Sequence, residues 1–574
     1  MENLYLLLVI VLAVLAIGDL IVGVSNDAVN FLNSAVGSKA ISLRTIMILA
    51  GLGVAFGAFF SSGLMEVARK GIFNPGEFYF DEIILIFTAV MLTDILLLDF
   101  FNTLGMPTST TVSIVFELLG AAVFMSLIKI TSSSGEISDL INYINTSKAI
   151  QIISGIVLSI IVALTIGAIV QWICRIFLTY EFEKKPLWVS VLFSGIALSA
   201  ITYFILMKGI KGTPWAGLKF DIIGGMKIKD FIELEVLKVS ILNFIFWCGL
   251  SYSLIKFFKT NIYKVIIGVG TFALALAFAG NDLVNFIGVP IAAYQSYEAW
   301  ISSGVNASQF SMEAMSAKVP TPAAFLILSG LVMVLTLWFS SKARKVMKTE
   351  LDLANQGYIK ERFQPSLFSK FIVKFFQKIS VILEGLLPEK LKKKIELQFS
   401  GSANQKKFVN DPEAPSFDML RACVNLAVAS ILISIATSYK LPLSTTYVTF
   451  MVAMGTSLAD RAWGRDSAVY RVSGVISVIA GWFLTAITAF IVSGIIVSLI
   501  HIGGFQAIAI ILFIILLIVG KNFIAHRNEE MEVDRDKILK AESKSMKGVM
   551  EESSGNIIKF FKRVDLIFGN LIEG

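Results

Sequence analysis

Apolar stretches close to the length of a membrane-spanning helix recur along most of the chain, with short polar segments between them. They cover residues 4–24, 41–64, 83–101, 150–178, 187–207, 236–257, 265–279, 323–339, 424–436, 472–499 and 507–523. A helix that crosses a bilayer needs about 20 mainly apolar residues. We therefore expect an all-α integral membrane protein with about 10–12 transmembrane helices.

Two further apolar stretches, residues 106–128 and 441–458, are interrupted near their starts by Pro, Ser and Thr. Non-helical backbone survives at membrane depth only where protein or a polar cavity satisfies its hydrogen bonds. We therefore expect these stretches to form two re-entrant hairpins or broken helices.

Composition agrees with this pattern. Of the 574 residues, 56% are hydrophobic and 16% are charged, with a mean hydropathy of +0.78. A soluble domain carries about 25% charged residues. The segment 4–16 follows a glutamate, has no Lys or Arg before it and lacks a clear cleavage site, so we interpret it as a retained membrane segment. We expect a multi-pass protein of the plasma or inner membrane.

The net charge of +7 is concentrated in one polar block, residues 341–417. Because the block lies between membrane spans, we interpret it as a cytoplasmic insertion and expect no nucleic-acid partner. Basic residues in loops favour the cytoplasmic side. On this rule the ends at Arg69–Lys70, at Arg175 and at the start of the block should all be cytoplasmic. The side of the N-terminus stays open, and Asp460 should pair with Arg461 at an interface.

These features suggest a division of the chain into five parts. They are a first repeat with linking helices (1–207), the start of a second repeat (231–340), the insertion (341–417), the remainder of the second repeat (418–526) and a polar tail (527–574).

The chain lacks the residue patterns of a catalytic or transition-metal site. Its three cysteines are far apart in apolar surroundings, and its two histidines lie near the C-terminal end. Neither the cysteines nor the histidines have the close spacing of metal ligands. An intramembrane hydrolase would need a nucleophile with a base, usually His. We therefore expect no enzyme activity and no cofactor beyond a coupling ion.

Two pairs of short motifs recur in the same order. The acidic motifs, residues 26–31 and 281–286, both have the pattern Asn-Asp-x-Val-Asn-Phe. The hydroxyl motifs, residues 107–111 and 442–446, both have the pattern Pro-x-Ser-Thr-Thr. Removing the polar block brings the two motif spacings close to each other. Such an internal duplication is typical of secondary transporters, and we expect two inverted repeats.

The acidic motifs suit a cation. An Asp inside a membrane segment is costly and is a functional-site hypothesis by default. Asp27 and Asp282 each have flanking asparagines, and carboxylate and amide oxygens are hard ligands suited to Na⁺. Nearby Gly23, Gly280 and Gly288 would allow the helix to break and expose carbonyl groups. The alternative is a buried polar cluster that only holds helices together.

The hydroxyl motifs suit an anion. Pro is favoured at a helix start, hydroxyl groups donate hydrogen bonds, and the free N–H groups of a helix N-terminus attract negative charge. Two such ends facing each other would bind one small tetrahedral anion. Neither motif contains Lys or Arg. Each motif alone would also suit an ordinary N-cap.

These residues resemble the PiT family of inorganic phosphate transporters. The resemblance rests on residues 23–30, 35–38, 66–72, 280–288 and 441–446, with a looser match at 342–349. It implies an inverted-repeat symporter that imports phosphate with Na⁺ or H⁺. It further implies phosphate binding by Ser109, Thr110, Thr111, Ser444, Thr445 and Thr446, cation binding by Asn26, Asp27, Asn30, Asn281, Asp282 and Asn285, with Na⁺ at Asp27 and Asp282, and an accessory role for Glu66.

One departure from the family bears on the coupling ion. Many members have His after the hydroxyl motif, where this chain has Val112 and Tyr447. The loss of a titratable group favours Na⁺ over H⁺. Beside phosphate and the coupling ion, we expect the lipid bilayer as a partner, and a homodimer is allowed. Transport of sulfate or another oxyanion, H⁺ coupling and a passive anion channel stay open as alternatives.

Further acidic residues fall inside apolar stretches, namely Asp19, Asp94, Asp99 and Glu117. Asp19 precedes Asp27 by about two helical turns and could face the same cavity. A cation role for any of these four is a weaker hypothesis than for the acidic motifs.

Overall fold

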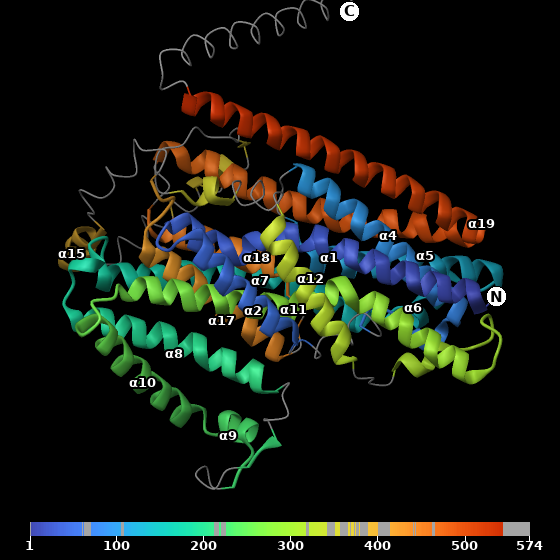
Figure 1. Cartoon of the computed structure of the whole chain (residues 1–574), viewed down its shortest axis with the longest axis horizontal. Helices are drawn as coiled ribbons and strands as arrows, with labels where there is room; N and C mark the ends of the chain where they lie inside the picture. The colour runs from blue at the N-terminus through green and yellow to red at the C-terminus, as the bar shows by residue number, and fades with distance from the viewer. Residues whose placement is uncertain are drawn as a thin grey trace, which may run out of the picture. The chain divides into compact units, whose positions relative to one another are not determined.

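The structure, a computed structural model, describes residues 2–59, 61, 71–104, 108–211, 217–219, 225–316, 321–340, 350–355, 366–367, 369–371, 373–374, 378, 388–399, 414–439, 441, 443–461 and 465–542. Over this part of the chain the protein is helical, with three isolated β-bridges and no strand (Figure 1). The α-helices are α1 (Glu2–Ser38), α2 (Leu43–Phe59), α4 (Phe80–Leu104), α5 (Thr110–Ser132), α6 (Leu140–Tyr143), α7 (Thr146–Leu178), α8 (Leu187–Lys211), α9 (Ile228–Leu234), α10 (Val236–Lys256), α11 (Ile262–Ser303), α12 (Ala323–Phe339), α15 (Glu389–Phe399), α17 (Met419–Ser438), α18 (Thr445–Ala459) and α19 (Arg465–Glu542). Short 3₁₀ turns lie at Pro75–Glu77, Ile137–Asp139, Phe182–Lys184 and Met312–Ser316.

The helices confirm an all-α membrane protein. Within the described ranges, eight helices are long and apolar enough to cross a membrane, and three more apolar helices are shorter. Large apolar side chains on α7, α10 and α12 remain exposed, as expected for surfaces that face lipid. α19 leaves helical geometry at Gly504, where φ is 57°. Residues 509–574 form a separate unit from residues 1–508.

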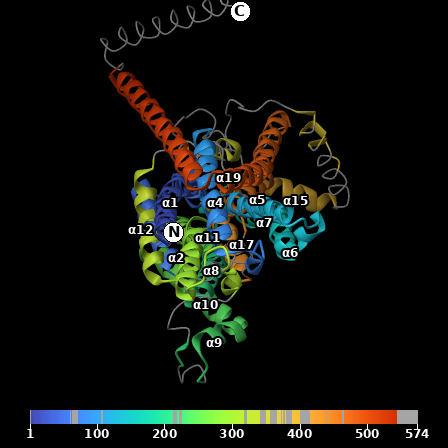
Figure 2. The ribbon, with the colours of Figure 1, turned by 90° about the vertical axis from the view of Figure 1, so that its right-hand side faces the viewer.

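The acidic motifs lie in the middle of two long antiparallel helices, α1 and α11. The Tyr5 ring contacts Trp300 with centroids 5.2 Å apart, and the Phe31 ring contacts Phe278 at 5.0 Å. Residue numbers therefore rise along one helix as they fall along the other, which confirms the inverted arrangement of the repeats. Figure 2 shows α4 and α11 near the N-terminal end of α1.

The predicted breaks at the acidic motifs are wrong, since α1 and α11 are continuous through them. Gly23 serves a different purpose. A Cβ at Gly23 would lie 2.1 Å from the Phe286 ring. The glycine thus lets the two helices approach closely, as small residues do in membrane proteins.

The first hydroxyl motif lies at the turn of a helical hairpin made by α4 and α5. The outer ends of the arms meet where Lys129 pairs with Glu82 at 2.8 Å. The inner end lies beside the middle of α1, because Asn102 Nδ2 donates to the Val22 carbonyl at 2.9 Å. The hairpin therefore enters and leaves on one side of the core.

The second hydroxyl motif lies at the turn of a matching hairpin, α17 and α18, which enters from the opposite end. Its outer ends meet where Arg421 Nε donates to Asp460 at 2.9 Å. Its inner end reaches the middle of α11, where Thr437 Oγ1 donates to Asn281 at 3.4 Å. The two re-entrant hairpins are confirmed, with one correction. The apolar stretches 83–101 and 424–436 are hairpin arms, not separate full crossings, because each chain turns back at its motif.

Each hairpin packs closely against a helix of the other half. A Cβ at Gly120 of α5 would lie 2.1 Å from the Phe490 carbonyl oxygen of α19. A Cβ at Gly455 of α18 would lie 2.2 Å from the Leu164 carbonyl oxygen of α7. Each glycine stands eleven positions after the N-cap serine of its helix (Ser109 to Gly120, Ser444 to Gly455). The glycines are therefore equivalent positions of the duplication.

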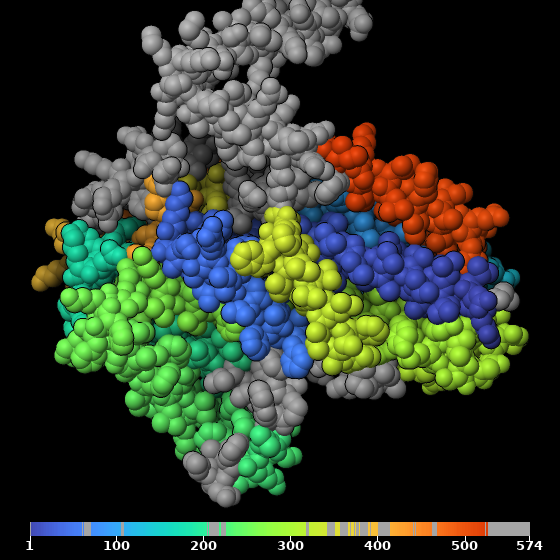
Figure 3. Space-filling view, viewed as in Figure 1, coloured from blue at the N-terminus to red at the C-terminus, as the bar shows by residue number. Residues whose placement is uncertain are grey.

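α2 covers one flank of this core and packs against α11 and α12. Figure 3 shows α12 lying between α1 and α2 on one face. α2 ends at Phe59, and Ser61 Oγ donates to the Gly280 carbonyl at 3.3 Å, beside the acidic motif of α11. The stretch 41–64 is thus not one continuous crossing helix in the described residues.

The predicted cytoplasmic side of the loops needs a correction. Gly71 directly follows Arg69–Lys70, and its neighbour Ile72 accepts a hydrogen bond from Asn145, just before α7 begins. Arg175 lies at the other end of α7, a helix of 33 residues. Arg69–Lys70 themselves lie outside the described residues. Ile72 and Arg175 lie at opposite ends of a spanning helix, so the chain just after Arg69–Lys70 and the end at Arg175 cannot both face the cytoplasm.

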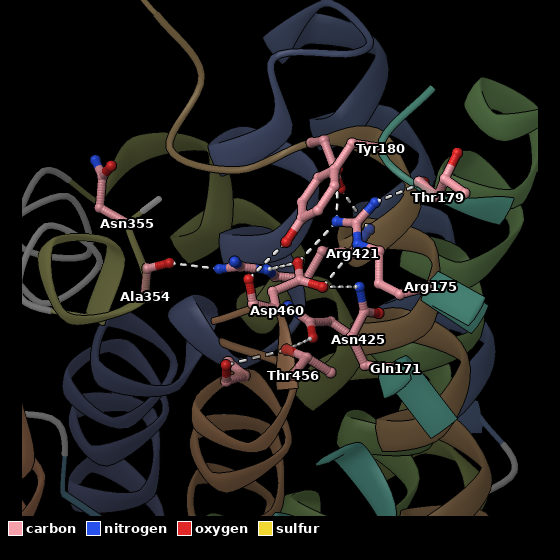
Figure 4. A network of polar contacts seen from close by, with 12 residues as sticks. Gln171, Arg175, Thr179, Tyr180, Ala354, Asn355, Arg421, Asn425, Thr456 and Asp460 are labelled. Carbon is pink, nitrogen blue, oxygen red and sulfur yellow. Dashed lines mark hydrogen bonds and ion pairs between the residues drawn. The ribbon is translucent and has the colours of Figure 1, made fainter. Parts of the chain in front are cut away.

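The end of the core at Arg175 is closed by a buried ion-pair network (Figure 4). Asp460, which follows α18, accepts hydrogen bonds from Arg175 at 2.7 Å and from Arg421 at 2.9 Å. Burial alone would raise the pKa of Asp460, but the two guanidinium groups outweigh it and hold that pKa at about 2. The predicted pairing of Asp460 with Arg461 is wrong, since Arg461 lies over the Phe399 ring.

Candidate functional site

Four helices converge at the centre of the core, and each brings one motif. α1 and α11 bring the acidic motifs from mid-helix, and α5 and α18 bring the hydroxyl motifs at their N-termini. The twelve predicted phosphate- and cation-binding side chains, at positions 26, 27, 30, 109–111, 281, 282, 285 and 444–446, all lie here and are at most 4% exposed. The structure thus brings together residues that the sequence separates by hundreds of positions.

Within each half, the acidic motif holds its own hydroxyl motif. Thr110 Oγ1 donates to Asp27 Oδ2 at 2.8 Å, and Asn26 Nδ2 donates to the Thr108 carbonyl at 2.8 Å. In the second half, Thr445 Oγ1 donates to Asp282 Oδ2, and Asn281 Nδ2 donates to the Leu443 carbonyl at 2.9 Å. The two sets of contacts are equivalent position by position.

Between the halves, the same residues form crossed contacts. Thr111 Oγ1 donates to Asp282 Oδ1 at 3.2 Å, and Thr446 Oγ1 donates to Asp27 Oδ1 at 3.3 Å. The Asn30 amide donates to Thr446 Oγ1 at 3.0 Å, and the Asn285 amide donates to Thr111 Oγ1 at 2.9 Å. Each aspartate therefore contacts both hydroxyl motifs, so movement of one repeat alters the site of the other.

Ser109 and Ser444 cap the two hairpin helices. Ser109 Oγ accepts from the Val112 N–H at 3.2 Å, and Ser444 Oγ accepts from the Tyr447 N–H at 3.1 Å. The caps hold the first turns of α5 and α18 in place, with their partial positive charge at the centre of the core. An anion between these helix ends would meet N–H and hydroxyl donors from both repeats.

The two carboxylates are the candidate cation ligands of the site. Asp27 and Asp282 accept hydrogen bonds from neutral hydroxyl and amide groups in the contacts above. In the described part of the chain no group of three or more His, Cys, Asp and Glu side chains is placed to hold a metal ion. A cation at Asp27 or Asp282 would therefore take its other ligands from amide, hydroxyl or carbonyl oxygens, which suits Na⁺.

Some predicted residues lie outside the described residues, namely Glu66 and the motif prolines at positions 107 and 442. The structure also adds residues that the motifs did not indicate. The Thr108 and Leu443 carbonyls bind the motif asparagines, and Thr449 Oγ1 donates to Asn30 at 3.3 Å. Thr449 could have been found by its spacing, since it follows Thr445 by one helical turn.

Comparison with known proteins agrees with this geometry. The sequence profile of the phosphate transporter family matches residues 23–350 and 372–569. A candidate phosphate permease of Thermococcus kodakarensis is 28% identical over 326 residues, covering 54% of this chain and 68% of that protein. A candidate phosphate permease of Pyrococcus horikoshii is 28% identical over 318 residues, with the same coverage.

The fold is also found in a solved structure. The structure named "The sodium-dependent phosphate transporter" aligns with a TM-score of 0.57 at 17% identity, covering 86% of this chain and 99% of that one. The predictions of a transporter rather than an enzyme, and of a multi-pass membrane protein, are confirmed. With matched motifs, inverted repeats and a profile match over most of its length, this chain belongs to the phosphate transporter family.

Proposed function

We propose that this protein imports inorganic phosphate by symport with Na⁺. The observation that carries the proposal is the central site, in which two helix N-termini meet two carboxylates that accept hydrogen bonds from hydroxyl groups of both repeats. An anion at the helix ends and cations at the carboxylates would neutralise each other. Binding of one would thus favour binding of the other, which is the requirement for coupling.

The lack of a basic side chain in the motifs also has a kinetic reason. A transporter must release its substrate, and a fixed Lys or Arg could hold phosphate too tightly. Hydroxyl and N–H donors bind a tetrahedral anion without adding a full charge. Na⁺ is favoured over H⁺ because this chain has Val112 and Tyr447 at the positions where many members of the family have the titratable residue His.

The test uses the purified full chain in liposomes and measures uptake of radiolabelled phosphate. Wild-type protein should take up phosphate when an inward Na⁺ gradient is imposed, and arsenate should compete. Asp27→Asn and Asp282→Asn should abolish this uptake, because each removes a charged cation ligand. Glu298→Gln is the matched control, since Glu298 lies on α11 but is exposed and bonded to Tyr294.

The outcomes separate the alternatives. Uptake driven only by a proton gradient would keep phosphate as the substrate and overturn the Na⁺ assignment. Equilibration without accumulation would indicate a channel. Absence of phosphate uptake under either gradient, with folded protein, would contradict phosphate as the substrate and make sulfate the next anion to test.

A further inference from the structure

Three buried carboxyl groups lie near the central site but are not part of it. Asp19 of α1, Asp94 of α4 and Glu117 of α5 are each 0% exposed. α1 and α4 meet here, since a Cβ at Gly18 would lie 3.7 Å from Ile95 Cδ1, and the Asp94 carboxyl lies close enough to those of Asp19 and Glu117 to interact with them electrostatically. We call these three residues the carboxyl cluster.

The surroundings supply almost no compensation for negative charge. Ser113 Oγ donates to Glu117 Oε1 at 2.7 Å. Both oxygens of Asp19, both of Asp94 and Oε2 of Glu117 have no hydrogen-bond partner among the described residues. None of the three takes part in an ion pair within the described residues. A charged group buried without such partners is strongly unfavourable and neutralises instead.

The burial itself favours protons. A carboxyl group that is buried with neither a hydrogen-bond donor nor a basic partner is much more stable neutral than ionised. Asp19 and Asp94 have neither among the described residues, so each should hold a proton when the helices are packed in this way. The same residues do not form a set placed to hold a metal ion.

The position of the cluster connects it to the transport site. Asp19 lies on the same helix as Asp27, about two turns away. Ser113 and Glu117 lie one and two turns beyond Thr110 on α5. The other titratable groups on the cluster's own helices are Glu2, Tyr5 and Asp27 on α1, Asp81, Glu82 and Asp99 on α4, and Lys129 on α5. Lys129 lies at the outer end of the hairpin, where it pairs with Glu82. The packed helices add Asp282 on α11, and Arg471 and His501 on α19. On the cluster's own helices, the groups within about two turns of it, Asp27 and Asp99, are both acidic and disfavour its ionisation further.

We propose that Asp19, Asp94 and Glu117 form a proton-binding site, separate from the central site, whose occupancy changes during the transport cycle. This inference rests on the proposed transport function. A shift of α5 against α1 or α4 that separates the carboxyl groups would release a proton. The protein would then couple phosphate movement to protons in addition to Na⁺, although the family's histidine is absent.

Infrared spectroscopy of the full-length protein in liposomes tests proton binding without transport. At pH 7 the wild-type protein should show the C=O stretch of protonated carboxyl groups. Glu117→Gln and Asp94→Asn should each reduce that band, and Glu82→Gln should not, because Glu82 lies on α4 but is ion-paired with Lys129. Labelling wild-type and Glu117→Gln protein with ¹³C-glutamate should shift a smaller part of the band in the variant, which distinguishes Glu117 from the buried Glu350.

A wild-type spectrum without this band, or a band that is unchanged in both variants and by the label, would overturn the proposal. A second experiment compares phosphate uptake with and without an inward proton gradient at constant Na⁺. The gradient should speed wild-type and Glu82→Gln uptake but not Asp94→Asn uptake. Equal wild-type rates under both conditions would contradict coupling to protons. If wild-type protein takes up no phosphate at all, the proposed function fails, while the infrared band still decides whether the cluster binds protons.

Discussion

At the residue scale, the polar groups of this protein are sorted by how their charge is compensated. Asp27 and Asp282 are held by hydroxyl and amide donors and Asp460 by two arginines, whereas the oxygens of Asp19 and Asp94 in the carboxyl cluster have no partner among the described residues, which is why we propose that the cluster binds protons. All are buried, but the partners differ. The partners, rather than burial, separate a binding site from a structural ion pair.

Asp460 should therefore be essential for stability. Asp460→Asn would leave Arg421, which is 0% exposed, without its carboxylate partner and would leave the equally buried Arg175 with Asp418 alone. We expect a loss of about 3–5 kcal/mol in the free energy of unfolding, seen as a lower thermal midpoint of the purified protein. Glu181→Gln is the control. It breaks an exposed pair with Lys184, worth less than about 1 kcal/mol, and an equal loss in both variants would contradict the argument.

The pH dependence of this network follows from the depressed pKa of Asp460. A carboxyl group whose folded pKa is about 2, below its unfolded value of about 3.9, stabilises the fold at every pH above the unfolded value. That stability is lost as pH falls from about 3.9 towards 2. The network should therefore stay intact over the whole physiological range.

At the element scale, small residues determine how closely the two hairpins pack against the neighbouring helices. Gly120 and Gly455 let α5 and α18 touch the backbone of α19 and α7, so the hydroxyl motifs at the other ends of these helices are placed by close packing. In lipid, helix association depends on such packing because lipid tails are as apolar as the side chains.

Gly455→Ala should consequently destabilise the protein. The added Cβ would lie 2.2 Å from the Leu164 carbonyl oxygen, and backbone cannot move aside as a side chain can. We expect a loss of about 1–3 kcal/mol, typical of overpacking, and slower phosphate uptake as α18 shifts. Gly249→Ala is the matched control on α10, where a Cβ meets nothing within 4 Å. If thermal unfolding shows the two variants to be equally stable, close packing at Gly455 is not required.

At the scale of the whole molecule, the inverted repeats fix which helix ends share a side of the membrane. The polar block returns to the core where Ser416 donates to the Gly37 carbonyl, at the C-terminal end of α1. Arg175 lies at the same end through its ion pair with Asp418. The opposite end contains Ile72 and the start of α7. Under the positive-inside rule, the basic composition of the polar block and the presence of Arg175 predict that this end faces the cytoplasm.

Labelling of single cysteines in intact cells tests this topology. After Cys174, Cys248 and Cys423 are replaced, a membrane-impermeant maleimide should react with Ser138→Cys but not with Lys184→Cys. Both positions are exposed, but Ser138 lies near the start of α7 and Lys184 beyond its end. The reverse labelling pattern would show that the protein has the opposite orientation.

The sequence by itself determined the fold class, the repeats and the central residues, because these depend on local features. Apolar stretches give membrane helices, and Asn26–Asp27 and Thr110–Thr111 recur as motifs that a single sequence displays. The tertiary structure decided what depends on contacts between distant segments. It showed that α1 and α11 are continuous, that apolar hairpin arms turn back inside the core, and that Asp19 lies against Asp94 and Glu117. The hydrophobicity of a residue predicts that it is buried, but it does not predict which residue it contacts when it is buried.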